Sequence, residues 1–294
     1  MSSHSAQKIH SYPIENDFLY MEVLNYGARI RKLYLKSKPN IPLVVGLENT
    51  SDYLKDIWSL GACLGPYAGR LEKNGKIELH GGEAAFSKQF WSVEQKSSKN
   101  NAITLKYLYR DIKNNLVSVY LRYHLEGSSL LLSYKAIPQA ECLLNLSNHT
   151  YFTLDCQQQI DHYQLQIHSE QYLKLDQNLL PTGEICNGLP PDIDFSFKKS
   201  IGKQRLDHIY LTQNSTNSSE LTKVASVSSQ QSNIQMDVYT DQEVLVCFTP
   251  NTFAGICFET QGFPNAPAHP HFSQAYVGPN QEYQQQSRFS FSNF

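Results

Sequence analysis

The sequence of 294 residues has no long apolar stretch. No run reaches the length of about 18 apolar residues that a membrane-spanning helix needs. The first twenty residues also contain no apolar segment of signal-peptide length. We therefore expect no membrane partner and a cytoplasmic location for this chain.

Clustered cysteines and an excess of one charge are also missing. The six cysteines are scattered without a C-x-x-C pair, and we interpret them as buried reduced thiols of a cytosolic protein, not as disulfides or zinc ligands. The formal net charge is −2, with acidic and basic residues interspersed. No basic stripe indicates nucleic acid, so a neutral small molecule is the favoured partner.

Helical periodicity is almost absent, and its one short candidate is 51–60, where Ser51 would cap the helix. Alternating segments rich in Val, Ile, Tyr, Phe and Leu recur instead. These segments lie at 18–23, 29–35, 103–109, 116–124, 129–136, 163–167, 234–239, 244–249 and 255–261. They predict one all-β domain over 1–294, built as a large antiparallel β-sandwich or twisted double sheet. The Ser/Asn/Gln-rich piece 213–232 is predicted to be a mobile loop inside it.

One predicted strand, 145–154, carries an unusual load of polar groups. It reads N-L-S-N-H-T-Y-F-T-L, and alternation along a strand places Asn145, Ser147, His149 and Tyr151 on one face. A purely structural strand would place Val or Ile there. The alternative is an ordinary edge strand with one polar face and a histidine whose hydrogen bonds are satisfied.

Four further motifs place polar groups beside bends or inside apolar runs. They are G-P-Y-A-G-R ending at Arg70, L-H-G-G with His80, R-L-D-H with Asp207, and G-I-C-F-E-T-Q with Glu259. Each one alone has a structural explanation, as a surface ion pair, a turn residue, a cap or a solvent-facing carboxylate. In the last motif, Cys257, Glu259 and Gln261 would share one strand face, which predicts that Cys257 lies near any pocket built there.

Together and in this order, the motifs resemble those of the aldose 1-epimerase (galactose mutarotase) family. The resemblance begins at N-Y-G-A (25–28) and includes N-H-T-Y-F-T-L, P-T-G-E-I (181–185) and F-E-T-Q-G-F-P-N-A (258–266). It ends with V-G-P-N-Q-E-Y (277–283) and spans nearly the whole chain. The family fold is a large antiparallel β-sandwich, which agrees with the strands expected from alternation.

The resemblance implies a role for each matching residue. It implies that His149 is the general acid on the sugar ring oxygen and that Glu259 is the general base on the anomeric hydroxyl. Asp207, His80 and Arg70 would bind the sugar, and Gln261 is included as a further substrate-binding residue. The implied substrate is a small-molecule monosaccharide such as galactose or glucose, acted on by a monomer or homodimer.

The chemistry suits these residue types, because opening a hemiacetal removes one proton and donates another. No hydride, phosphate or redox step is involved, so we expect no cofactor and no metal. The sequence has no Gly-rich phosphate loop and no clustered Cys or His ligands.

Two departures from the family pattern bear on the site. Gly69 stands where the family usually has asparagine, which implies a missing sugar contact. The connection from Arg70 to His80 is short, and the alternative for His80 is a turn displaced from the pocket.

Three alternatives remain open. One is an epimerase of hexose 6-phosphates, which would need a cluster of Arg or Lys around the phosphate. Another is a sugar-binding protein that has lost catalysis, although binding alone needs no matched acid and base. The third is a glycosidase using Asp207 and Glu259, in which His149 would have no role.

Overall fold

The computed structural model describes residues 7–97, 101–214 and 220–294 and consists mainly of antiparallel strands. Its largest sheet has nine strands, in the order β17-β14-β19-β20-β24-β10-β9-β8-β7. Their bounds are β7 (Ser92–Ser97), β8 (Ala102–Arg110), β9 (Leu116–Glu126), β10 (Ser129–Pro138), β14 (Gln164–Ile167), β17 (Lys199–Ser200), β19 (Thr222–Ser229), β20 (Ile234–Thr240) and β24 (Tyr283–Asn293).

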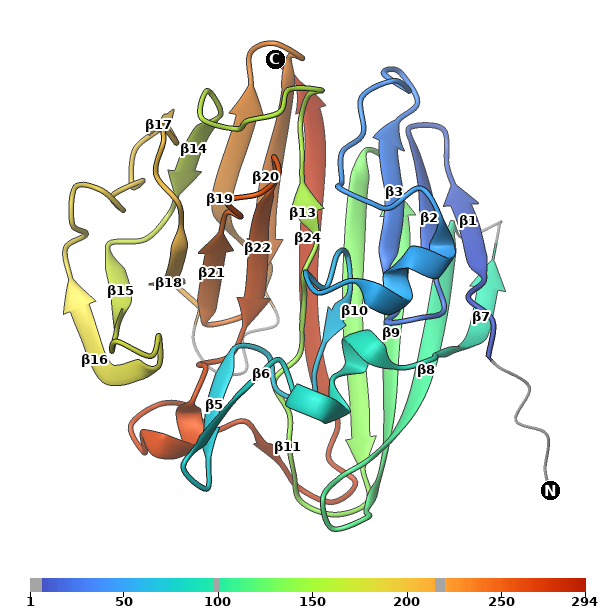
Figure 1. The fold of residues 1–294 in the computed structure, drawn as a ribbon, viewed down its shortest axis with the longest axis vertical. Coiled ribbons are helices and arrows are strands. Elements are labelled where there is room, and N and C mark those ends of the chain that lie inside the picture. The colour runs from blue at the N-terminus through green and yellow to red at the C-terminus, as the bar shows by residue number, and fades with distance from the viewer. Residues whose placement is uncertain (1–6, 98–100, 215–219) are drawn as a thin grey trace.

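Two smaller sheets lie over this large sheet (Figure 1). A six-stranded sheet follows the order β13-β22-β21-β18-β15-β16, and a three-stranded sheet follows β1-β2-β3. The bounds are β13 (Tyr151–Phe152), β22 (Ile256–Gln261), β21 (Val244–Phe248), β18 (Asp207–Leu211), β15 (Gln171–Leu175), β16 (Pro181–Asn187), β1 (Ser11–Glu15), β2 (Leu19–Leu24) and β3 (Ile30–Leu35). The predicted antiparallel β-sandwich is therefore confirmed.

Short ladders and single turns complete the described chain. The pairs are β4 (Cys63–Leu64) with β12 (Ser147–Asn148), β5 (Arg70–Lys73) with β6 (Lys76–Leu79), and β11 (Cys142–Leu143) with β23 (Tyr276–Val277). The 3-10 helices are η1 (Thr50–Lys55), η2 (Gly82–Ala84), η3 (Phe86–Lys88) and η4 (Ala266–Ala268). No helix in the described residues is both long enough and apolar enough to span a membrane.

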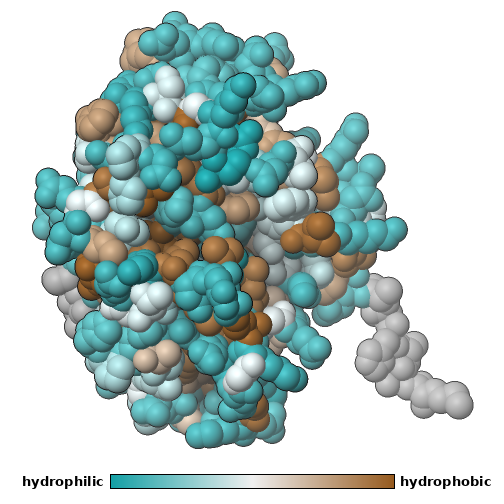
Figure 2. Space-filling model, turned by 60° about the vertical axis from the view of Figure 1, so that its left-hand side comes forward, coloured by the Kyte–Doolittle hydropathy of each residue, from teal (hydrophilic) through white to brown (hydrophobic). Residues whose placement is uncertain are grey.

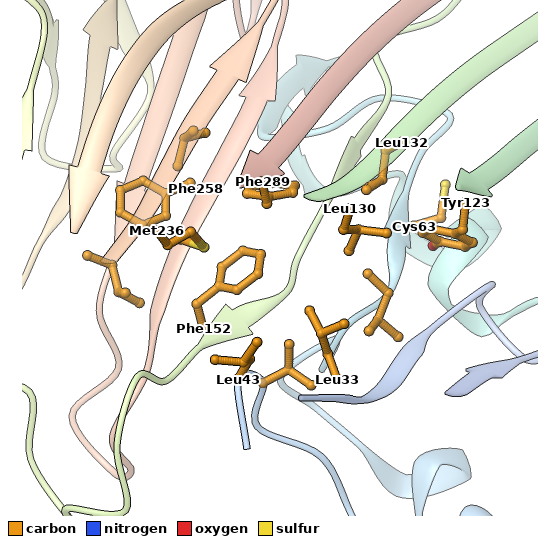
Figure 3. Packing of buried hydrophobic residues seen from close by; sticks show 14 of the residues in the cluster. Leu33, Leu43, Cys63, Tyr123, Leu130, Leu132, Phe152, Met236, Phe258 and Phe289 are labelled. Carbon is orange, nitrogen blue, oxygen red and sulfur yellow. The ribbon is translucent and has the colours of Figure 1, made fainter. Parts of the chain in front are cut away.

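The main core lies between the layers, and Phe152 is at its centre (Figure 3). The Phe152 ring packs against Phe289 of β24, with ring centroids 4.7 Å apart. On β22, Ile256 and Phe258 also join this core. Because successive side chains of a strand point to opposite faces, the residues between them are directed to the outer face of the six-stranded sheet.

The predicted helix at 51–60 is wrong in length and type. The chain forms only the 3-10 helix η1, which is preceded by Asn49 and ends where Asp56 adopts an extended conformation. The Asp56 carboxylate then accepts hydrogen bonds from the N–H groups of Trp58 (2.9 Å) and Leu60 (2.8 Å). The 57–60 segment is thereby fixed as a loop, because its backbone donors are satisfied by a side chain.

The predicted loop at 213–232 is wrong over Thr222–Ser229, which forms β19 inside the nine-stranded sheet; residues 215–219 lie outside the described part. Most of β19 is buried, and Ser229 Oγ donates to the Asp155 carboxylate at 2.5 Å. Small serines fit this closely packed position, so the polar composition of the segment wrongly predicted an exposed loop.

All six cysteines are free thiols, as predicted. Four of them are buried, but Cys156 is exposed and Cys186 is half-buried, so the expectation that all six are buried is wrong.

Candidate active site

A cavity of about 220 Å³ opens on the outer face of the six-stranded sheet. Figure 2 shows apolar side chains gathered in a hollow on this side of the molecule, framed by hydrophilic residues. The polar side chains that line the cavity are Ser59, Arg70, His80, His149, Tyr151, Asp207 and Glu259. Its apolar lining includes Ile57, Leu175, Leu179, Pro181, Ile209, Val246 and Phe248.

The 145–154 stretch crosses the floor of this region as two short ladders instead of one continuous strand. Ser147–Asn148 pairs with β4, and Tyr151–Phe152 pairs with β22. Between the ladders, the His149 N–H donates to Ala62 O (2.8 Å), and His149 O accepts from the Gly61 N–H (3.0 Å). His149 is therefore held by its own backbone on both sides.

Tyr151–Phe152 is an edge of the six-stranded sheet, as the alternative of an ordinary edge strand expects, but the polar face of the stretch is buried. Asn145, Ser147, His149 and Tyr151 are each at most 6% exposed. Asn145 Oδ1 accepts from the Gly262 N–H at 2.9 Å, and Ser147 Oγ donates to Thr260 O at 3.1 Å. The polar face thus joins this stretch to the chain around β22.

On β22 the expected alternation brings a carboxylate beside the imidazole. Glu259 is only 3% exposed, and its Oε1 lies 3.4 Å from His149 Nε2. On the other side of the ring, Cys257 Sγ lies 3.5 Å from His149 Nδ1. Cys257 is therefore near the cavity, as expected, but it is fully buried behind His149 and does not form part of the wall.

Burial shifts the pKa values of this pair in opposite directions. It lowers the pKa of His149 to about 4, because the imidazolium loses its hydration. It raises the pKa of Glu259 to about 8, with a further increase from the nearby Asp207 carboxylate and an opposing effect of Arg70. Between about pH 4 and pH 8 the pair therefore holds one proton, and in the empty site that proton is on Glu259.

Arg70 and Asp207 form a partly exposed ion pair at the mouth of the cavity, with Nη2 and Oδ2 3.6 Å apart. Arg70 begins β5, and Asp207 begins β18. In the sheet register, Asp207 pairs with Phe248, which pairs in turn with Cys257. Asp207 is thus placed two strands away from the strand that carries Glu259.

His80 lies in the cavity wall despite the short connection from Arg70. That connection is the β5–β6 hairpin, in which Arg70 pairs with Leu79, so the chain returns to its starting point. The His80 ring lies edge-on to His149, with centroids 5.3 Å apart. Its Nδ1 accepts a hydrogen bond from the Gly69 N–H at 3.1 Å, and burial lowers its pKa well below the ordinary value.

Gln261 differs from the other expected site residues. It is fully buried and does not line the cavity, and neither atom of its amide has a hydrogen-bond partner among the described residues. A Cβ added to Gly69 would lie 3.1 Å from Gln261 Nε2 and 2.8 Å from Pro264 Cβ. Gly69 also has a φ of +76°, so close packing and backbone conformation favour glycine there.

The sequence interpretation did not assign a role to the 57–59 loop or to the ion pair beneath it. Ile57 and Ser59 line the cavity, and the loop is held by Asp56, which pairs with the buried Arg29 at 2.5 Å. The Arg29 guanidinium lies over the rings of Tyr26 and Tyr53, 5.5 and 5.3 Å from their centroids. Arg29 follows N-Y-G-A directly, and a charged residue next to that motif was the signal in the sequence.

His80, His149 and Glu259 offer ligand atoms within 4.8 Å of one another, close enough to surround a metal ion. The hydrogen bond from the Gly69 N–H to His80 Nδ1 opposes such a site. It requires the proton of neutral His80 to be on Nε2, whereas a ligating histidine usually donates its other ring N–H to an acceptor. The orientation of the His80 ring therefore disfavours the trio as a metal site.

Comparison with known proteins gives matches over nearly the full chain. The family model described as Aldose 1-epimerase matches residues 10–290. Galactose mutarotase of Sus scrofa is 26% identical over 98% of this chain and 95% of its own length. Aldose 1-epimerase of Escherichia coli K12 is 24% identical over 94% of this chain and 93% of its own.

Solved structures share the fold. A GalM/aldose epimerase homologue from C. elegans superposes with a TM-score of 0.86 at 20% identity, covering 97% of this chain and 99% of that one. Galactose 1-epimerase from Lactobacillus acidophilus gives a TM-score of 0.83 at 22% identity, covering 100% and 97%.

Proposed function

The chain belongs to the aldose 1-epimerase family, and on that premise we propose that it interconverts the α and β anomers of free aldohexoses such as galactose and glucose. The pairing of His149 with Glu259 carries the proposal. The two groups lie 3.4 Å apart in one cavity, and burial moves their pKa values to about 4 and about 8. Two titratable groups whose environments separate their pKa values are typical of acid–base catalysis.

In the proposed reaction, Glu259 accepts the proton of the C1 hydroxyl while His149 donates a proton to the ring oxygen. A C1=O bond forms as the bond between C1 and the ring oxygen breaks, which gives the open-chain aldehyde. Rotation about C1–C2, followed by the reverse proton transfers, closes the ring to the other anomer. The protein and the sugar exchange only protons, so the proposal includes no cofactor and no metal.

The resting protonation state adds one step before ring opening. Because the pair's proton is on Glu259 in the empty site, it must first move to His149, whose Nε2 lies 3.4 Å from Glu259 Oε1. A sugar hydroxyl that donates a hydrogen bond to the ionised carboxylate lowers the pKa of Glu259 and favours this move. Substrate binding thereby prepares the base and the acid together.

The remaining polar groups of the wall are proposed to hold the sugar. His80, with its proton on Nε2, donates one hydrogen bond toward the cavity. Arg70 and Asp207, already paired at 3.6 Å, present donors and acceptors that match the hydroxyls of a neutral sugar. Gln261 is proposed to support the pocket from behind Gly69 and not to touch the sugar directly.

The alternatives have less support. Among the described residues that line the cavity, Arg70 is the only Lys or Arg, and it is paired with Asp207. A sugar phosphate needs a stronger cationic site. A binding protein without catalysis would not require two buried groups with opposed pKa shifts. A glycosidase using Asp207 and Glu259 would leave His149 without a role.

Polarimetry tests the proposal. Freshly dissolved α-D-glucose and α-D-galactose should reach their equilibrium rotations faster with the protein than in buffer alone. Glucose 6-phosphate serves as the comparison substrate, and a preference for it would favour the phosphate alternative. No acceleration with any free aldose would refute the proposed function.

A further inference from the structure

Part of the apolar wall of the cavity is carried by a hairpin that joins its sheet through a short ladder and the apolar packing of Leu173 and Leu175. Strands β15 and β16 pair with each other, and β16 is the edge of the six-stranded sheet. The register between β15 and β18 contains a single pair, Tyr172 with Tyr210. A hairpin with so short a ladder needs other contacts to hold its far end in place.

That far end forms part of the site. Leu175 at the end of β15, Leu179 in the turn and Pro181 at the start of β16 all line the cavity. Pro181 opens the P-T-G-E-I motif, to which the proposed proton transfers assign no role. The position of this turn therefore sets the width of the cavity on its apolar side.

Two histidines of the 263–275 segment, from the H-P-H sequence, contact this turn from outside. His269 Nε2 lies 2.8 Å from Pro181 O, and His271 Nε2 lies 2.8 Å from Gly183 O. A carbonyl oxygen only accepts hydrogen bonds, so both histidines donate through Nε2–H.

Gly183 allows the close approach of the two segments. Its φ is +90°, and a Cβ there would lie 2.7 Å from His269 Nδ1. The donating segment is itself well anchored, because Phe272 stacks on Phe263 with centroids 4.4 Å apart. Gln274 Nε2 lies 3.1, 3.2 and 2.9 Å from the carbonyl oxygens of Ala266, His269 and Phe272. In Figure 1 the orange 263–275 segment lies at the base of the six-stranded sheet.

We propose that His269 and His271 are positioning residues that hold the β15–β16 turn as the apolar wall of the sugar site. The inference rests on the proposed function for its kinetic consequence. Neither histidine lines the cavity, so neither touches the reacting atoms. Their loss should change how tightly the sugar is held and leave the proton transfers unchanged.

Three variants and one control test the inference. His269→Phe keeps a ring and removes the donor, His269→Gln keeps an amide donor, and His271→Phe removes the more exposed bond. A neutral hydrogen bond corresponds to about a two- to tenfold change in an equilibrium. We expect His269→Phe to raise KM by about that factor, with kcat within about twofold of wild type. His271→Phe should raise KM by a smaller factor. His269→Gln should keep KM close to the wild-type value. His10→Phe, on an exposed residue, should change neither constant.

Hydrogen–deuterium exchange gives a readout that does not depend on activity. Amides of 176–187 should exchange faster in His269→Phe, and the β20–β24 pair should exchange at the wild-type rate. An unchanged KM and unchanged exchange in a folded His269→Phe variant would overturn the inference while the proposed function stands. A fall in kcat with KM unchanged would overturn it as well. If wild type shows no activity on any aldose, the proposed function fails and the exchange rates alone decide the inference.

Discussion

The thiol of Cys257 lies 3.5 Å from Nδ1 of His149, on the side of the ring that faces away from Glu259. Burial raises the pKa of Cys257 well above its ordinary value, so the group remains S–H, a weak donor whose sulfur is also a weak acceptor. The proposed transfer from Glu259 needs an unprotonated Nε2, so the neutral imidazole carries its proton on Nδ1 and donates it to Cys257 Sγ. Cys257 thereby keeps Nε2 of His149 available for proton transfer with the Glu259 carboxyl group.

Replacing Cys257 with alanine should lower kcat, because the ring then has no partner that selects its tautomer. A thiol is a weak hydrogen-bond partner, so we expect a loss of about two- to threefold, at the low end of a neutral hydrogen bond. Cys257→Ser should retain activity. Cys247→Ala removes an equally buried thiol that faces the main core, and it should leave kcat unchanged in the same polarimetric assay. Equal losses in the two alanine variants would assign the effect to packing.

The acid–base pair itself should be far more sensitive. His149→Ala and Glu259→Gln should each lower kcat by about a hundred- to ten-thousand-fold with little change in KM, because the transition state loses a proton donor or acceptor. Initial rates of mutarotation across sugar concentrations measure both constants. A full-rate Glu259→Gln variant would contradict the role proposed for the base.

The pH dependence of kcat/KM should show a plateau. The pair holds one proton above the pKa of His149, about 4, and below the pKa of Glu259, about 8. Below the first value it holds two protons and above the second it holds none, so activity should fall on both sides. Rates measured from pH 3 to pH 10, corrected for the uncatalysed reaction, check this. A plateau that starts near the ordinary histidine pKa would contradict the burial argument.

Glu259→Gln should also make the protein more stable in alkali. The folded-state pKa of Glu259 is raised, so its contribution to stability is greatest below the unfolded-state pKa and is lost as pH rises toward about 8. A tenfold difference in proton affinity between the folded and unfolded states corresponds to about 1.4 kcal/mol. Glutamine does not ionise, so the Tm advantage of the variant over wild type should be larger at pH 9 than at pH 5. Equal differences at both pH values would show that the carboxyl is not perturbed.

Gly69→Asn should lower stability without improving sugar binding. The resemblance to the family implied a missing sugar contact at this position, but the Cβ would lie 2.8 Å from Pro264 Cβ at a φ of +76°. Strain of this kind costs about 1–3 kcal/mol. Gly75→Asn is the control, because Gly75 has a φ of +72° and no atom near the added Cβ. A lower KM in a Gly69→Asn variant of normal Tm would restore the missing-contact hypothesis.

The alternation of polar and apolar residues predicted which side chains share a strand face better than it predicted the bounds of the strands. It placed His149 and Tyr151 on one face and Glu259 beside Cys257, because the period of two holds wherever the backbone is extended. It did not show that 145–154 breaks into two ladders, because the break depends on Gly61 and Ala62, which are distant in sequence. The position of His80 depended on recognising a hairpin between Arg70 and Leu79. The burial of β19 could not be predicted from its own composition, because it depends on the neighbouring strands β14 and β20.

The two halves of the cavity differ in how they are attached to the rest of the protein. Glu259 alternates along β22 with Phe258 of the main core, so a change beside the proton-transfer pair also disturbs the packing between the sheets. The β15–β16 hairpin pairs with its sheet at a single residue pair and is otherwise held by apolar packing of Leu173 and Leu175 and by the two histidine contacts. Over evolutionary time, sugar preference can therefore diverge through the hairpin while the proton-transfer pair stays fixed. Laboratory selection for new aldoses should accumulate its substitutions in 175–187 and 263–275.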